Sequence, residues 1–355
     1  MSREFAWPGI KVFKERAMST VMETIEIGTS GLVASRIALG TWAIGGSMWG
    51  GTDTRSALRT IDAAIDRGIT LIDTAPVYGF GHAEEIVGRA LRAGRRRDRV
   101  LIATKCGLSW HGEKVFRNAA PGRIQQEVEE SLRRLRTDRI DLYQVHWPDA
   151  LVPVDETAAV MARLFEQGKI RAIGVSNFSP AQMETFRHAA PLHATQPPYN
   201  LFEREIEANV LPHAKKTGLT VLAYGALCRG LLSGKMTAAT RFEGDDLRRG
   251  DPKFQEPRYQ QYLAAATELK SFARERYGKS LLALAIRWIL DQGPTIALWG
   301  ARRADQLDGL EDVFGWSLDE TAMREIDAIL ARNILDPVGA EFMAPPSSAK
   351  VRAAA

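Results

Sequence analysis

The fold is indicated by two short apolar stretches, Ile140-Asp-Leu-Tyr-Gln-Val-His146 and Ile170-Arg-Ala-Ile-Gly-Val-Ser176. Each is typical of a strand that is buried on both faces. Between them, Val160, Leu164 and Phe165 mark one face of an amphipathic helix. A strand, a helix and a second strand make a β/α unit, in which the strands are parallel and the connection is right-handed.

The same unit recurs along the chain from Glu23 onward. Helices are predicted between the strands, for example at Ala83–Leu91 and Ile206–Ala214, and a capping box at Ser179–Gln182 begins another. Eight units indicate a single (β/α)8 barrel. A doubly wound sheet is the alternative, but the absence of any break in composition favours a closed barrel. The eight predicted strands are Ile37–Trp42, Ile69–Asp73, Val100–Lys105, Ile140–His146, Ile170–Ser176, His193–Gln196, Leu219–Tyr224 and Thr295–Trp299.

Three parts of the chain fall outside this repeat. We interpret residues 1–21 as a loosely attached extension, 22–332 as the barrel with an N-terminal β-hairpin cap, and 333–355 as an irregular tail. The prolines in the tail suit either a disordered end or a flap over the barrel mouth. The long segment Cys228–Arg258 follows the seventh strand, and loops of this length in a compact domain are usually functional.

Composition excludes several classes of protein. The chain has 355 residues, and Lys+Arg 47 against Asp+Glu 43 leaves a net charge of +4, too small an excess to indicate a nucleic-acid or membrane partner. Two cysteines are too few for a disulfide scaffold, so we expect a reduced, cytoplasmic protein. No apolar run is long enough to span a membrane, and the first twenty residues lack the apolar core of a secretory signal.

Reactive side chains occur where the predicted strands end. Asp73, Lys105 and His146 end three successive strands or follow from them, and Tyr78 lies five residues past Asp73. Barrel enzymes carry their chemistry at the carboxyl ends of the strands. A lone histidine there would more often be structural, but four such residues in this pattern indicate an active site.

The motifs around these residues resemble those of the aldo-keto reductases over roughly residues 23–330, and most closely the bacterial branch that acts on small polyols, sugars and aldehydes. Each motif is weak alone, but their common order along the chain is specific. They are Ile72-Asp-Thr-Ala-Pro-Val-Tyr78-Gly, Thr104-Lys105, Gln144-Val-His146-Trp-Pro, Gly174-Val-Ser-Asn-Phe178, Gln196-Pro-Pro-Tyr-Asn200, Tyr224-Gly-Ala-Leu-Cys-Arg-Gly-Leu-Leu-Ser-Gly-Lys235 and Trp299-Gly-Ala-Arg302-Arg-Ala-Asp-Gln306.

The resemblance implies a role for each of four catalytic residues. Tyr78 would be the general acid, and a cationic Lys105 beside it would lower the pKa of the phenol. Asp73 would pair with Lys105, and His146 would donate a hydrogen bond to the carbonyl oxygen. No metal ion is expected, because no histidine pair has ligand spacing.

The resemblance also implies NADP(H) as the cofactor. Ser176, Asn177 and Gln196 would hold the carboxamide, Tyr224 would stack on the nicotinamide, and Arg302 would contact the 2′-phosphate. Gly309 and Leu310 depart from the family, where many relatives carry an acid or amide followed by Asn at the adenine. The predicted cofactor residues are Gly40, Thr41, Trp42, Asp73, Ser176, Asn177, Gln196, Tyr224, Gly225, Ala226, Leu227, Arg229, Gly230, Lys235, Arg248, Gly300, Arg302 and Gln306.

The expected substrate is a small aldehyde, ketone, sugar or polyol. An aromatic pocket is predicted from residues on loops at the catalytic end, namely Trp42, Trp49, Phe80, Trp110, His111 and Trp147. Two other functions occur on the same kind of barrel. A nicotinamide-binding regulatory subunit, such as the potassium-channel β-subunits that share the barrel, would bind the cofactor with little turnover. A metal-dependent hydrolase on the same barrel lacks ligand spacing. The sequence leaves the oligomeric state open.

Overall fold

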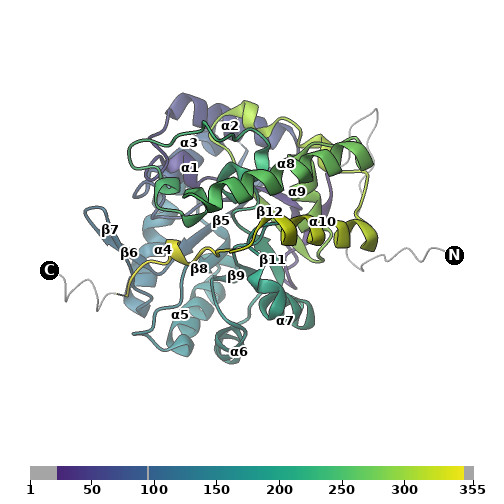
Figure 1. Cartoon of the computed structure of the whole chain (residues 1–355). Coiled ribbons are helices and arrows are strands. Elements are labelled where there is room, and N and C mark those ends of the chain that lie inside the picture. Colours follow the sequence, from purple (N-terminus) through teal and green to yellow (C-terminus); the bar gives the residue numbers. More distant parts are fainter. Residues whose placement is uncertain (1–21, 94–95, 348–355) are drawn as a thin grey trace.

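Eight parallel strands close into a barrel in the computed structural model, which describes residues 22–93 and 96–347 (Figure 1). The pairing runs β3, β4, β5, β8, β9, β10, β11 and β12, and β12 pairs back with β3. The predicted (β/α)8 barrel is therefore confirmed. The barrel strands are β3 (Ile37–Gly40), β4 (Leu71–Asp73), β5 (Leu101–Cys106), β8 (Ile140–Val145), β9 (Ile170–Ser176), β10 (Ala194–Gln196), β11 (Thr220–Ala223) and β12 (Thr295–Gly300).

Helices cover the outside of the barrel and alternate with its strands. Ser179 and Gln182 form the predicted capping box at the start of α6. The helix predicted at Ile206–Ala214 is in fact divided, because Asn209 breaks it and caps the second part. The helices are α1 (Trp42–Gly45), α2 (Thr54–Asp66), α3 (His82–Ala93), α4 (Pro121–Leu135), α5 (Val154–Glu166), α6 (Pro180–Ala189), α7 (Val210–Thr217), α8 (Arg258–Tyr277), α9 (Leu281–Leu290) and α10 (Glu320–Asn333), with the 3₁₀ helix η2 (Glu205–Ala208) before α7.

The core has two layers. Small and aliphatic side chains of the strands fill the barrel, among them Ala38, Leu142 and Ile296. The antiparallel hairpin β1 (Thr24–Glu26) and β2 (Val33–Ser35) packs Ile25 and Ile27 into the same cluster, so it closes one end of the barrel. A larger apolar layer lies between the strands and the helices. The other end of the barrel remains available for the site.

The long loop after β11 folds into short 3₁₀ helices. They are η3 (Cys228–Ser233), η4 (Leu247–Arg249) and η5 (Pro252–Phe254), and α8 begins at Arg258. Leu247 N donates to Met48 O at 3.0 Å, so the loop reaches the segment that follows β3. The loop thus lies over the barrel mouth.

Residues 334–347 cross the barrel toward a second hairpin, β6 (Leu108–His111) and β7 (Lys114–Arg117) (Figure 1). Arg117 N donates to Pro346 O at 2.9 Å, and Arg117 forms a parallel bridge with Ser347. The 3₁₀ helix η8 (Glu341–Met343) lies within this crossing. This part of the tail follows the barrel surface as a flap would, whereas residues 1–21 and 348–355 lie outside the described residues.

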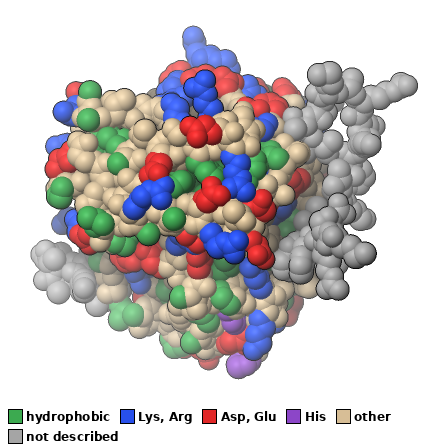
Figure 2. Space-filling model, turned by 45° about the vertical axis from the view of Figure 1, so that its right-hand side comes forward, with side chains coloured by type: hydrophobic (Ala, Val, Ile, Leu, Met, Phe, Trp, Pro, Cys, Tyr) green, Lys and Arg blue, Asp and Glu red, His purple; other side chains and the backbone are tan. Residues whose placement is uncertain are grey.

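One face of the molecule carries charges of both signs. Figure 2 shows Lys and Arg side chains interspersed with Asp and Glu over one face, with apolar side chains scattered between them. No helix in the described ranges is both long and apolar enough to cross a membrane.

Candidate active site

The four predicted catalytic residues meet at one end of the barrel. Asp73 ends β4, Lys105 lies in β5, His146 follows β8, and Tyr78 lies in the turn before α3. The Lys105 ammonium donates to Asp73 Oδ2 at 2.6 Å and to the Tyr78 hydroxyl oxygen at 3.2 Å. Because β4, β5 and β8 are parallel neighbours, their carboxyl ends share one rim of the barrel.

Asp73 and Lys105 form a buried ion pair. Their side chains are 3% and 0% exposed. Lys105 also donates to Thr74 O at 3.0 Å, and Asp73 Oδ1 accepts from Gln196 Nε2 at 2.9 Å and from Gln144 Nε2 at 3.3 Å. A buried ion pair is stable only when its remaining polar positions are hydrogen-bonded. These contacts fix the direction of the Lys105 ammonium toward Tyr78.

The net shift of the Tyr78 pKa is upward, and the lowering effect expected of Lys105 stays a prediction. Burial and the Asp73 carboxylate raise the pKa of the Tyr78 phenol well above its usual value. The positive charge of Lys105 is offset by Asp73, so the phenol lies beside an ion pair rather than an isolated cation. Tyr78 therefore keeps its proton at neutral pH.

The His146 imidazole lies beside Tyr78. The two ring centroids are 5.9 Å apart at an interplanar angle of 83°. Burial and the nearby Lys105 lower the pKa of His146 well below its usual value, so the ring is neutral near pH 7. Its ring nitrogens make no hydrogen bond within the described part of the chain. A neutral imidazole has one N–H donor, which is thus free to bind a ligand oxygen.

A cavity of about 1080 Å³ opens over this group. Asp73, Tyr78 and His146 line the cavity, while Lys105 lies behind its wall. Every residue predicted to contact the cofactor also lines it. These residues are Gly40, Thr41, Trp42, Asp73, Ser176, Asn177, Gln196, Tyr224, Gly225, Ala226, Leu227, Arg229, Gly230, Lys235, Arg248, Gly300, Arg302 and Gln306.

The predicted carboxamide ligands are already hydrogen-bonded to one another. Tyr224 Oη donates to Asn177 Oδ1 at 2.9 Å. Asn177 Nδ2 donates to His146 O and to Ser176 Oγ, each at 3.0 Å. These contacts hold Tyr224 against the cavity. Gln196 Oε1 accepts no hydrogen bond from a described residue, so it is available to an amide N–H of a ligand.

The loop of residues 225–235 supplies the next part of the wall. Gly225 and Gly230 have φ values of 69° and 100°, and a Cβ at Gly230 would lie 2.7 Å from Met236 Cε. Lys235 is exposed, and its ammonium has no partner among residues 22–93 and 96–347. The guanidinium of Arg229 is not free in the same way, because it binds Glu203 and Asp251 at 2.5 Å each. Lys235 is therefore the available cation of this loop.

Arginines gather at the far end of the cavity. Arg302 donates from Nη1 to Trp49 O at 2.5 Å and to Gly51 O at 3.0 Å. Burial and the positive charges of Arg248 and Arg303 lower the pKa of Arg302. Arg248 is paired with Asp246, at 2.5 Å from its Oδ2. Arg303 is paired with Asp305 at 3.1 Å, so Arg302, whose guanidinium donates only to carbonyl oxygens among the described residues, is the arginine here that favours an anionic ligand group.

Gln306 and the two residues that depart from the family have structural roles here. Gln306 Oε1 accepts from the backbone N–H groups of Arg302 and Arg303 at 2.9 and 3.1 Å, which orders the 3₁₀ helix η6 (Ala304–Leu307). Gly309 has a φ of 87°, and Leu310 is 2% exposed. Neither Gly309 nor Leu310 lines the cavity.

The predicted aromatic pocket is formed in part. Trp42, Trp49, Phe80 and Trp147 line the cavity, and the Trp42 ring stacks on Tyr78 at 5.9 Å and 21°. Trp110 and His111, which were predicted in the same set, do not line it. Trp110 packs on Phe80 with 5.7 Å between ring centroids, and His111 lies exposed at the turn of the hairpin. The two residues therefore lie outside the lining.

Part of the wall was missed by the sequence reasoning. Phe342, Met343 and Pro345 of the tail line the cavity, as do Leu108, Glu113 and Val115 of the β6–β7 hairpin. Arg117 joins the two segments, since its Nε donates to Pro345 O at 2.9 Å and its guanidinium lies 5.0 Å from the Trp147 ring. No local motif marks these residues. The prolines of the tail are compatible with a flap over the barrel mouth, but they do not indicate which residues the tail contacts.

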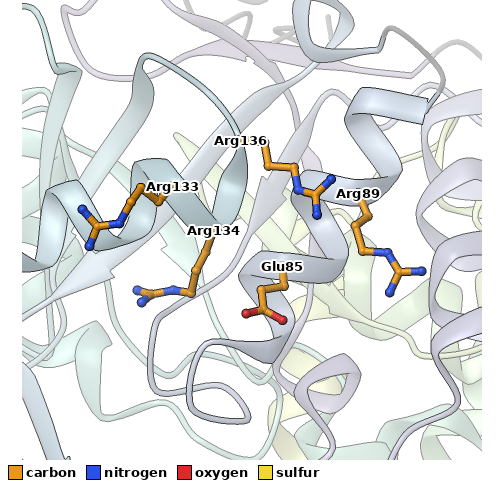
Figure 3. A pocket seen from close by; sticks show the side chains of 5 residues that line it. All are labelled: Glu85, Arg89, Arg133, Arg134 and Arg136. Carbon is orange, nitrogen blue, oxygen red and sulfur yellow. The ribbon is translucent and has the colours of Figure 1, made fainter.

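A smaller recess of about 330 Å³ lies between α3 and α4. Glu85 lies among its arginines (Figure 3). Arg134 is also paired with the buried Glu84 at 2.7 Å, so the charge is partly balanced. It shares no lining residue with the barrel cavity. Its lining residues are Glu85, Arg89, Arg133, Arg134 and Arg136.

Comparison with known proteins identifies the family. The model of the Aldo/keto reductase family matches residues 36–331, which is most of the chain. The chain belongs to the aldo-keto reductase family. It is 60% identical over 331 residues to the aldo-keto reductase YhdN of Bacillus subtilis (strain 168), covering 93% of this chain and 100% of that one. The glycerol dehydrogenase AKR11B4 from Gluconobacter oxydans superimposes with a TM-score of 0.82 at 58% identity, covering 90% and 99% of the two chains.

More distant relatives of this aldo-keto reductase differ in their cofactor. The NADH-specific methylglyoxal reductase of Escherichia coli (strain K12) is 35% identical over 332 residues, covering 88% of this chain and 100% of that one. An aldo-keto reductase from Klebsiella pneumoniae, solved in complex with NADPH, has a TM-score of 0.69 at 27% identity and covers 90% and 100%. Both nicotinamide cofactors thus occur among the relatives.

Proposed function

We propose that this protein is an NADP(H)-dependent oxidoreductase that interconverts the carbonyl and alcohol of a small aldehyde, ketone, sugar or polyol, with Tyr78 as general acid/base. One observation carries the proposal. The Tyr78 hydroxyl is held 3.2 Å from the Lys105 ammonium, next to a His146 ring with no other described partner. A carbonyl oxygen between Tyr78 and His146 would receive two hydrogen bonds.

The protein side chains would manage the proton and the charge on oxygen. Tyr78 holds the proton, since its raised pKa keeps the phenol neutral. The neutral His146 donates its N–H to the same oxygen and stabilises negative charge that develops there. Lys105, directed by Asp73, stabilises the phenolate that remains after transfer. When bound, the nicotinamide cofactor supplies or takes up the hydride.

The cavity residues fit such a cofactor. Gln196 Oε1 is unpartnered among described residues and suits the carboxamide N–H. Tyr224, fixed by Asn177, offers an aromatic face for stacking. At the other end, Lys235 and Arg302 supply positive charge for phosphates.

A preference for NADP(H) over NAD(H) is supported by the arginines at that end. Burial and the nearby Arg248 and Arg303 lower the pKa of Arg302, and a 2′-phosphate would neutralise the positive charge there. A relative solved with NADPH agrees with this, whereas the Escherichia coli relative is named as NADH-specific. Titration of the protein with NADPH and with NADH tests this preference.

The substrate class is supported by the lining and by the relatives. Trp42, Trp49 and Trp147 form aromatic walls near Tyr78, and such walls suit the C–H faces of sugars and polyols as well as flat aldehydes. The relatives named above include a glycerol dehydrogenase and a methylglyoxal reductase, both named for small oxygenated substrates. The partner is thus proposed to be a small molecule and not a nucleic acid or a membrane.

Organisation and location are proposed on related grounds. Residues 22–332 would form the catalytic unit, preceded by the extension and followed by the tail at 333–355. Cys106 and Cys228 are both free and buried, which suits a reduced compartment such as the cytoplasm.

Absorbance at 340 nm tests the proposal. Purified protein with NADPH or NADH is mixed with glyceraldehyde, methylglyoxal and aromatic aldehydes, and the reverse reaction is measured with glycerol and sugar alcohols. Turnover with NADPH supports the proposal. Tight cofactor binding without turnover on any substrate would favour the regulatory subunit instead.

A further inference from the structure

Four charged side chains form a buried group, and one of them, Arg229, belongs to the loop of residues 225–235. Arg229 Nη2 lies 2.5 Å from Glu203 Oε1, and Arg229 Nε lies 2.5 Å from Asp251 Oδ2. Lys253 Nζ lies 2.9 Å from the same Glu203 oxygen. The side chains are 3% exposed or less, with two positive and two negative charges. We name Glu203, Arg229, Asp251 and Lys253 the ionic cluster.

The ionic cluster holds the middle of the loop. Arg229 has a φ of 53°, a conformation that costs a residue with a Cβ on the order of 1–3 kcal/mol and persists where contacts over-determine it. Its guanidinium supplies those contacts, through two carboxylates on other segments of the chain. The adjacent backbone therefore follows the position of this side chain.

The same cluster holds the start of the loop. Asn200 Nδ2 donates to Glu203 Oε2 at 2.7 Å and to Gly225 O at 3.0 Å. Gly225 directly follows Tyr224, the residue proposed to stack on the nicotinamide. The backbone on both sides of Ala226 and Leu227 is thus tied to Glu203.

The ionic cluster also reaches the C-terminal wall of the cavity. Lys253 Nζ donates to Gly339 O at 2.6 Å. The Phe342 ring lies 5.5 Å from the Arg229 guanidinium and lines the cavity, so the same cation contacts both walls. Met343 and Pro345 continue that wall toward Arg117.

We propose that Arg229 is a positioning residue that couples the two walls of the cavity, and not a ligand of the cofactor phosphates. Through Glu203 and Asp251 it holds the loop that would bind the cofactor. Through Glu203 and Lys253 it holds the tail segment that would face the substrate. The proposal rests on the proposed function, because it assigns the two walls to cofactor and substrate. Its consequence is that a change at the tail anchor alters cofactor binding, although the anchor touches neither ligand.

Lys253→Met tests this coupling, because it removes the contacts of Lys253 with Gly339 O and with Glu203 Oε1 and leaves Arg229 paired with both carboxylates. The dissociation constant of NADPH is measured by its fluorescence, and the KM of the substrate by turnover. We expect both constants to rise together, by about tenfold, as for the loss of one hydrogen bond to a charged group. A purely structural role would lower Tm and the active fraction, and would leave the constants of the folded protein unchanged.

A matched control is Arg258→Gln. Arg258 pairs with Asp336 on the exposed side of the tail, away from the residues that line the cavity. This variant loosens the tail without touching the ionic cluster. The proposal requires that its NADPH dissociation constant equal that of the wild type.

Arg229→Lys and Arg229→Met extend the test. Lysine keeps the positive charge but lacks the planar guanidinium that binds Glu203 and Asp251 together. Arg229→Lys should therefore keep only part of the NADPH affinity that Arg229→Met loses. If Arg229→Met does not fold, Lys253→Met still decides the question. A folded Lys253→Met with unchanged NADPH affinity and substrate KM would overturn the coupling. Failure of wild-type protein to bind NADPH at all would instead refute the proposed function.

Discussion

Lys105 Nζ lies 2.6 Å from Asp73 Oδ2, with both side chains almost fully buried. The pair carries no net charge, so its field at Tyr78 is that of a dipole rather than of a cation. Burial then dominates, and it raises the pKa of the Tyr78 phenol instead of lowering it. This state suits proton donation in carbonyl reduction. If Tyr78 is the acid/base as proposed, the phenol would have to lose its proton before alcohol oxidation, so we expect oxidation to gain rate as pH rises.

Tyr78→Phe should retain cofactor binding and lose most turnover. The substitution removes only the hydroxyl that is proposed to donate the proton, and general acid–base help is typically worth about 100- to 10,000-fold. Turnover is measured where chemistry limits the rate, and NADPH binding by fluorescence. Tyr277→Phe is the matched control, since that hydroxyl is also buried but does not line the cavity. Retention of more than about a tenth of wild-type turnover would exclude Tyr78 as the acid.

Lys105→Met should cost stability as well as rate. Asp73 would become an unpaired buried carboxylate, and breaking a buried ion pair by removing one partner costs about 3–5 kcal/mol. Thermal unfolding at neutral pH measures the loss. The double variant Lys105→Met with Asp73→Asn should regain stability but not turnover. An unchanged Tm in the single variant would contradict the buried-pair argument.

Much of the fold and the four central residues could be predicted because local patterns carry them. Apolar runs that end at Asp73, Lys105 and His146 predict the strands. Because the carboxyl ends of these strands meet at one rim of the barrel, the same runs also predict that the three residues lie together. The C-terminal wall could not be predicted, since contacts such as Arg117 with Pro345 join segments far apart in the chain. Which of Trp110 and Phe80 faces the cavity depends on how the β6–β7 hairpin packs, and no local pattern gives that.

The protonation states and ion-pair partners of buried side chains could not be predicted from the sequence either. The neighbours of Tyr78 were predicted, but the pKa depends on burial, which the sequence does not measure. Similarly, Arg229 was predicted as a cofactor residue from its motif. Its carboxylate partners, Glu203 and Asp251, come from two other segments and could be found only in three dimensions.

Glu127→Gln should stabilise the protein at alkaline pH. Glu127 is buried in α4, and burial raises the pKa of its carboxyl to about 8. The folded state then binds a proton that the unfolded chain releases near pH 4.5, so wild-type stability falls as pH rises from about 4.5 to about 8. Glutamine stays neutral, and its Oε1 can still accept from Gly107 N, as Glu127 Oε2 does at 2.9 Å.

Thermal unfolding between pH 5 and pH 9 measures this difference. The two proteins should have similar Tm values at pH 5, and the variant should be the more stable above pH 8. Glu129→Gln on the same helix is the control, because its carboxylate is 45% exposed and binds Lys169 at the surface. A Tm difference between Glu127→Gln and wild type that does not change with pH would show that Glu127 titrates near its usual value.

Arg302→Ala should change cofactor preference. Arg302 is half-buried beside Arg248 and Arg303, and a 2′-phosphate would relieve their mutual repulsion. Hydrogen bonds to charged groups contribute about 1.5–3 kcal/mol, so NADPH should bind roughly 10- to 150-fold more weakly while NADH changes little. Raised salt should narrow the preference of the wild type for NADPH over NADH, because the contact of Arg302 with the phosphate would be partly exposed.

Arg302 also donates to Trp49 O and Gly51 O, so its loss is expected to loosen the segment that contains these two residues. Asp245→Ala is the control for this loosening. Asp245 accepts from Met48 N and Gly50 N in the same segment but carries no positive charge for a phosphate, so its loss should weaken the binding of both cofactors alike. Equal losses of NADPH and NADH affinity in Arg302→Ala would mean that Arg302 orders the segment and does not select the phosphate.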